Sequence, residues 1–162
     1  MEATIRKLEN NLVTIGTGVA ILGLWELFKI ILYVIVYWEE IKALSATLPP
    51  IEAALAIGLI VAVVVTELAL NCFIGLSAVG EGQGIRKRSV YLIATGFLIV
   101  VNVAMILLEV SSLFFVEDFS LISAVSMVID ITLVGLLTDM LVSSLRLRKL
   151  KQQKAEKEGL PA

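Results

Sequence analysis

Residues 51–79 read IEAALAIGLIVAVVVTELALNCFIGLSAV, and their first half contains thirteen consecutive apolar or glycine residues, Ala53 to Val65. A helix rises about 1.5 Å per residue, so about 20 mostly apolar residues are needed to cross a hydrocarbon core about 30 Å thick. This stretch is long enough to do so, and it also contains Glu67 and Asn71. It therefore predicts a membrane span with an acid and an amide inside it.

The composition of the whole chain agrees with this interpretation. Of 162 residues, 59% are hydrophobic, and the mean hydropathy of +0.98 lies far above that of soluble globular proteins. Apolar runs predict four spans, at about residues 12–38, 51–79, 89–115 and 119–145. The expected fold is all-α, an integral membrane four-helix bundle in a single membrane domain. Residues 146–162 are expected to form a basic cytoplasmic tail, and residues 39–50 a surface loop that could include one amphipathic turn.

The distribution of basic residues predicts the orientation. Two Lys or Arg residues precede the first span, three lie between the second and third, and six follow the fourth. The opposite face has only Lys42. Because cytoplasmic segments retain Lys and Arg during insertion, we expect a multi-pass cell-membrane protein with both termini in the cytoplasm. Some of these basic residues are candidates for contact with anionic lipid headgroups: Arg86, Lys87, Arg88, Arg146, Arg148 and Lys149.

Seven ionisable or amide side chains lie well inside the predicted spans: Glu26, Lys29, Glu67, Asn71, Asn102, Glu109 and Asp130. A charged residue at the middle of a span opposes insertion by about 2.5–3.5 kcal/mol. Such residues must be protonated, paired, hydrated or bound to an ion. Helical spacing places Glu67 and Asn71 on a stripe with alanines, and Asp130 on a stripe with serines. We therefore expect the acids Glu67 and Asp130 to face the protein interior.

Two interpretations of these polar residues stay open. In the first, they hold the bundle together through hydrogen bonds between helices. In the second, their oxygen atoms form a site for a monovalent or hard divalent cation, or a relay for protons. The second predicts a small transporter or channel-like protein. The alternatives are a membrane scaffold or assembly partner, for which Gly16, Ala20 and Gly23 would form a contact surface, and a protein that binds lipid or an apolar small molecule. A homo-oligomer is compatible with each.

Several other chemistries are disfavoured by the residue types. The chain contains no histidine, which excludes the usual haem, zinc and carboxylate–histidine di-iron sites, and its single cysteine, Cys72, cannot form a disulfide within one chain. The glycines between Gly80 and Gly84 lack the GK[ST] ending of a phosphate-binding loop. We expect no cofactor, no nucleic-acid partner and no enzymatic activity, with a lipid-modifying reaction that uses two of the acids as the remaining enzymatic alternative.

Overall fold

The computed structural model describes residues 1–162 except 48, 86–88, 114–120 and 159–162. Within the helices, the side chains of some further residues also lie outside the described set: 26, 29, 33, 44–46, 109, 112–113, 121–123 and 158. The described residues form five α-helices: α1 (Glu2–Val36), α2 (Trp38–Thr47), α3 (Pro50–Gly82), α4 (Val90–Leu113) and α5 (Leu121–Glu158). The predicted all-α class is therefore confirmed.

Four of these helices, α1, α3, α4 and α5, are long and apolar enough to cross a membrane. Two of them, α1 and α5, extend by ten or more residues beyond the predicted spans. Helix α1 begins at Glu2 rather than near residue 12, and α5 continues without a break to Glu158. The basic segment after residue 145 is thus the last part of α5 over its described length.

The predicted surface loop at residues 39–50 was wrong, because most of this segment forms helix α2. Glu39 and Glu40 lie in the first turn of α2, where carboxylates interact favourably with the positive end of the helix dipole. The two prolines separate α2 from α3. Pro49 occupies the N-cap position of α3 and Pro50 the first helical position, where the missing backbone N–H removes no hydrogen bond.

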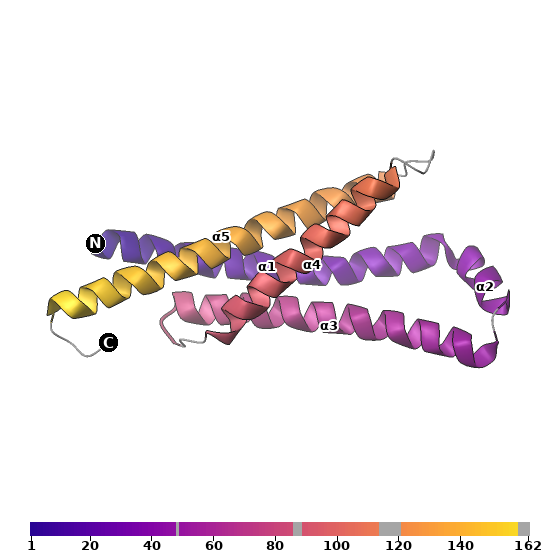
Figure 1. Ribbon diagram of the computed structural model, residues 1–162, viewed down its shortest axis with the longest axis horizontal. Coiled ribbons are helices and arrows are strands. Elements are labelled where there is room, and N and C mark those ends of the chain that lie inside the picture. Colours follow the sequence, from indigo (N-terminus) through magenta and orange to yellow (C-terminus); the bar gives the residue numbers. More distant parts are fainter. Residues whose placement is uncertain (48, 86–88, 114–120, 159–162) are drawn as a thin grey trace.

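The four long helices form a closed ring in the order α1, α3, α4, α5. Helix α1 packs against α3 and α5, and α4 packs against the same two helices from the other side. The N-terminal end of α1, the C-terminal end of α3 and the C-terminal end of α5 lie at the same end of the bundle (Figure 1). Helix α2 lies at the opposite end. We call the part of the bundle that holds these three helix ends the terminal half.

The buried core lies in the terminal half. Its apolar side chains come from all four long helices: Ile5, Leu12, Ile15, Val19, Ile74, Ala78, Tyr91, Leu98, Leu133, Leu137, Met140 and Leu147. In α3 the buried residues begin at Asn71, and every residue from 50 to 70 is exposed or half-buried. Exposed apolar side chains along this part of α3 are what a surface in contact with lipid chains requires.

Glycines bring α1 and α3 into close contact. A Cβ atom added to Gly16 would lie 2.6 Å from the carbonyl oxygen of Gly75, and one added to Gly75 would lie 2.5 Å from that of Gly16. A Cβ on Gly75 would also meet Ala20, and one on Gly23 would meet Asn71. Small residues allow helix backbones to approach in this way. The ridge of Gly16, Ala20 and Gly23 is therefore a helix contact surface within the chain.

Candidate functional site

Three of the buried polar side chains were predicted from the sequence to lie inside the spans, and each is on a different helix. They are Asn71 of α3, Asn102 of α4 and Asp130 of α5, with exposed fractions of 0%, 6% and 8%. We call these three residues the polar layer. Asp130 shares its face of α5 with the core residues Leu133 and Leu137, so its carboxylate points inward as the serine stripe predicts.

Contacts between the helices place the polar layer at one level. The Tyr91 hydroxyl lies 2.6 Å from the Ser144 hydroxyl, which sets the register of the antiparallel helices α4 and α5. Asn102 follows Tyr91 by eleven residues along α4, so it lies level with position 133, within one helical turn of Asp130. The two side chains thus occupy the same depth of the bundle.

Helix α3 brings Asn71 to the same depth. Tyr91 donates a hydrogen bond of 2.7 Å to Glu81, which sets α3 against α4. Asn71 precedes Glu81 by ten residues, so this register places it level with position 101, one residue before Asn102 along α4. On its other side Asn71 packs against α1 at Gly23, where an added Cβ would lie only 2.7 Å from the Asn71 Cβ. The small size of Gly23 leaves room for the amide.

Hydrogen bonding differs among the three residues. Asn102 Nδ2 donates to the Leu98 carbonyl oxygen at 2.9 Å, and the Ser126 hydroxyl lies 3.5 Å from Asp130 Oδ2. Neither Oδ1 nor Nδ2 of Asn71 has a hydrogen-bond partner in the described part of the chain. An unsatisfied buried amide opposes folding by about 1–3 kcal/mol, and native structures contain few of them. Asn71 therefore offers an acceptor and a donor to a small polar species.

The other residues predicted for the polar core are distributed as follows. Glu67 lies one turn from Asn71 on the same stripe of α3, is half-buried and has an interaction partner. The side chains of Glu26, Lys29 and Glu109 lie outside the described set. Within that set, no group of three or more Asp, Glu, Cys or His side chains could hold a metal ion. The polar layer therefore combines one carboxylate with two amides.

A second polar cluster lies at the chain-terminal end of the core, and the sequence analysis missed it. Its centre is the Glu81 carboxylate, which is only 5% exposed. Arg148 of α5 donates to it twice, from Nε to Oε1 at 2.7 Å and from Nη2 to Oε2 at 2.6 Å. Tyr91 of α4 donates to Oε2 at 2.7 Å. We call Glu81, Tyr91, Ser144 and Arg148 the terminal cluster.

The remaining contacts make the terminal cluster a connected network. Because the single phenolic proton of Tyr91 is directed at Glu81, the Ser144 hydroxyl is the donor in the 2.6 Å contact with Tyr91. The Arg148 guanidinium also lies 5.9 Å from the centre of the Tyr91 ring, and its Nη1 donates to the Ser89 hydroxyl at 2.9 Å. One carboxylate thereby joins α3, α4 and α5.

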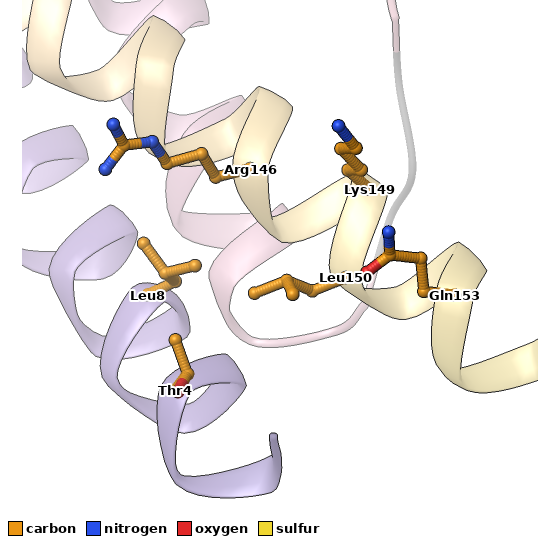
Figure 2. A pocket seen from close by; sticks show the side chains of 6 residues that line it. All are labelled: Thr4, Leu8, Arg146, Lys149, Leu150 and Gln153. Atoms are coloured by element: carbon orange, nitrogen blue, oxygen red, sulfur yellow. The ribbon is translucent and has the colours of Figure 1, made fainter.

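The predicted headgroup residues divide into three groups. Arg148 belongs to the terminal cluster and is largely withdrawn from the surface, with 19% of its side chain exposed. The second group, Arg86, Lys87 and Arg88, lies outside the described residues. Arg146 and Lys149 line a surface pocket of about 400 Å³ between α1 and α5. The side chains that line it are shown in Figure 2: Thr4, Leu8, Arg146, Lys149, Leu150 and Gln153.

A signal for Arg148 was present in the sequence. The core face of α5 passes through Leu133, Leu137, Met140 and Ser144 at helical spacing, and it continues at residues 147 and 148, three and four positions after Ser144. Extending this face past the predicted end of the span at residue 145 would have placed Arg148 in the interior.

Comparison with known proteins adds no relative, since no family model, curated protein or solved structure matches the chain.

Proposed function

We propose that the protein is a small transporter or channel-like membrane protein whose polar layer binds a hard cation or relays protons. The observation that carries the proposal is the Asn71 side chain, which is completely buried and has no hydrogen-bond partner among the described residues. It lies at the level of the Asp130 carboxylate. An amide that only stabilised the bundle would be expected to have its hydrogen bonds satisfied within it.

The atoms of the polar layer suit both chemistries. Asn102 uses its Nδ2 group on the Leu98 carbonyl, so Oδ1 is the atom that can coordinate or accept. Together with Asn71 Oδ1 and the Asp130 carboxylate, it supplies the oxygen ligands that hard cations prefer. Asp130 is also a group that can take up and release a proton. Ionisable residues inside a membrane commonly mark ion or proton pathways.

The position of the polar layer supports access from one side. Asn71 is the first buried residue of α3, and among the described side chains Asn102 is the last of α4 and Asp130 the first of α5. The layer thus lies where the packed core ends. On one side of it the core and the terminal cluster close the bundle, and on the other the residues of α3 are not buried. We propose that the transported species enters from the α2 side.

We also propose an orientation, namely insertion in the cell membrane with both termini in the cytoplasm. The excess of Lys and Arg around the two termini and between α3 and α4 supports this assignment. The N-terminal end of α1 and the C-terminal end of α5 lie at one end of the bundle, which agrees with it (Figure 1). In this orientation the terminal cluster closes the cytoplasmic side, and α2 lies outside.

Reconstitution into liposomes tests the function. Purified protein is assayed for flux of sodium, potassium, calcium and magnesium and for dissipation of a pH gradient. Asp130→Asn and Asn71→Leu should each abolish most of the flux, because one removes the titratable carboxylate and the other the amide. Asp139→Asn is the matched control, since Asp139 is an exposed acid on the same helix, and it should retain flux.

A second measurement separates function from folding. Because the Asn71 amide has no partner among the described residues, Asn71→Leu should leave the thermal stability in detergent unchanged or raise it. Loss of flux together with loss of stability in this variant would favour the scaffold interpretation. The transport proposal is also rejected if the wild-type protein shows neither flux nor ion-dependent stabilisation with any of these species.

A further inference from the structure

The pocket between α1 and α5 combines an apolar wall with two cationic side chains. Leu8 of α1 and Leu150 of α5 point toward one another across it, with Thr4 one turn below Leu8 (Figure 2). Arg146 and Lys149 lie along the α5 side. The volume of about 400 Å³ is sufficient for a small polar group together with part of a hydrocarbon chain.

The charges of the neighbouring residues show that these two cations differ from the others on this part of α5. Arg148 is bound to Glu81, Lys151 to Glu9 at 2.7 Å and Lys154 to Glu2 at 2.8 Å. Arg146 and Lys149 have no such acidic partner in the described part of the chain, and no acidic residue lines the pocket.

Two of these ion pairs also join the two walls of the pocket. Glu9 and Glu2 belong to α1, whereas Lys151 and Lys154 belong to α5, so the pairs join the two helices that form the pocket walls. Asn11 Nδ2 also donates a hydrogen bond of 3.1 Å to the Ser143 hydroxyl. This contact joins α1 and α5 at the end of the pocket that lies nearer the middle of the bundle. The pocket is therefore bracketed by contacts between its two walls.

The depth of the pocket matches the headgroup layer of a bilayer. Leu145, just before Arg146, is an exposed apolar residue, and the charged residues of α5 follow it. From Arg146 to Gln153 the helix advances about 10 Å. Each headgroup layer is several ångströms thick, about half the difference between the total bilayer and its hydrocarbon core. The pocket thus extends from the edge of the apolar surface into the headgroup layer of the membrane.

We infer that this pocket binds the phosphate of an anionic phospholipid. The Arg146 guanidinium, which extends toward α1 above Leu8 (Figure 2), contacts the phosphate oxygens. Lys149, whose ammonium group points away from Leu8, adds positive charge at the rim of the pocket. Thr4 and Gln153 offer further hydrogen bonds to the headgroup. Leu8 and Leu150 contact the glycerol and the first methylene groups of an acyl chain. This inference concerns a different site from the polar layer and does not depend on the transport proposal.

Binding of short-chain lipids to the detergent-purified full chain tests the inference. The probes are dioctanoyl phosphatidylglycerol, dioctanoyl phosphatidylcholine and inorganic phosphate, and the readouts are lipid adducts in native mass spectrometry and the shift in melting temperature. Phosphatidylglycerol should bind and stabilise the wild-type protein. The double variant Arg146→Gln/Lys149→Gln should bind it about thirtyfold more weakly, given the usual contribution of a basic residue near an anionic surface.

The control variant Lys7→Gln/Lys157→Gln removes the same charge from exposed positions that do not line the pocket, and it should bind phosphatidylglycerol like the wild type. An equal loss of binding in both variants would overturn the inference in favour of diffuse surface attraction. Equal binding of phosphatidylcholine, or equal stabilisation by inorganic phosphate, would overturn it as well. Both double variants should retain the wild-type melting temperature without lipid, because all four side chains are exposed.

Discussion

Arg148 binds Glu81 through two hydrogen bonds of 2.7 and 2.6 Å, although 67 residues separate them in the sequence. Glu81 lies in the last turn of α3, where the negative end of the helix dipole disfavours an acid. The guanidinium of Arg148 compensates for this effect and for the burial of the carboxylate. Because Tyr91 binds the same carboxylate, three helices depend on one ion pair.

Arg148→Gln should therefore destabilise the protein strongly. The substitution leaves the buried Glu81 carboxylate without its cationic partner, and removal of one partner of a buried pair typically costs about 3–5 kcal/mol. Because Arg148 is partly exposed, the lower end of this range is expected. Denaturant unfolding in detergent micelles, followed by circular dichroism, measures the loss.

Lys154→Gln provides the comparison, because it removes a cation from the same helix and breaks the pair with Glu2. That pair is exposed, with 35% of the Lys154 side chain and 70% of the Glu2 side chain accessible, so its removal should change stability little. Equal effects of the two substitutions would contradict a central role for the terminal cluster.

Tyr91→Phe should show that the terminal cluster acts as a unit. The variant loses the hydroxyl that binds Glu81 and Ser144 but keeps the ring beside the Arg148 guanidinium. A hydrogen bond to a charged group contributes about 1.5–3 kcal/mol. In a double-mutant cycle with Arg148→Gln, the two changes in unfolding free energy should differ from additivity by about 0.5–3 kcal/mol. Additive effects would mean that the two contacts are independent.

The fold could be predicted to a large extent, because each of the four long helices contains a long run of apolar residues in the sequence. Helix ends were harder to place. The polar residues at the start of α1 and the end of α5 ended the predicted spans, yet both helices continue through them, and ion pairs of Glu2 and Glu9 with α5 join the two ends. Helix α2 was missed because its charged residues suggested a loop, although two acids in its first turn favour a helix.

The site could be predicted only in part. A polar residue within an apolar run is conspicuous, so the sequence singled out Asn71, Asn102 and Asp130 as candidates, and all three are buried. It could not identify the terminal cluster, since Glu81 and Arg148 lie among other charged residues beyond the predicted spans and become neighbours only when α3 and α5 pack. The absence of a hydrogen-bond partner for Asn71 within the described chain is likewise a property of the packed structure.

Gly75→Ala should weaken the contact between α1 and α3. The added methyl group would lie 2.5 Å from the Gly16 carbonyl oxygen, a backbone atom that cannot rotate away. Overpacking of this kind typically costs about 1–3 kcal/mol, which should exceed the gain in helix propensity of up to about 1 kcal/mol. Thermal unfolding in detergent measures the difference.

Gly58→Ala is the matched control for this prediction, because it makes the same change in the same helix where no atom lies within 4 Å of the added Cβ. It should leave stability unchanged or raise it slightly through helix propensity. If Gly75→Ala were as stable as Gly58→Ala, the close approach of α1 and α3 would be wrong.

The proposed orientation predicts which residues a membrane-impermeant maleimide can reach in intact cells. The background is Cys72→Ser, which removes the single native cysteine. A cysteine at Lys42, exposed on α2, should react from outside, whereas one at Lys157, exposed near the end of α5, should react only after the membrane is permeabilised. The prediction follows from the excess of Lys and Arg at the end that holds both termini. Labelling of both positions after permeabilisation is the control for reactivity. The reverse pattern would place the termini outside, and the terminal cluster would then close the external side of the bundle.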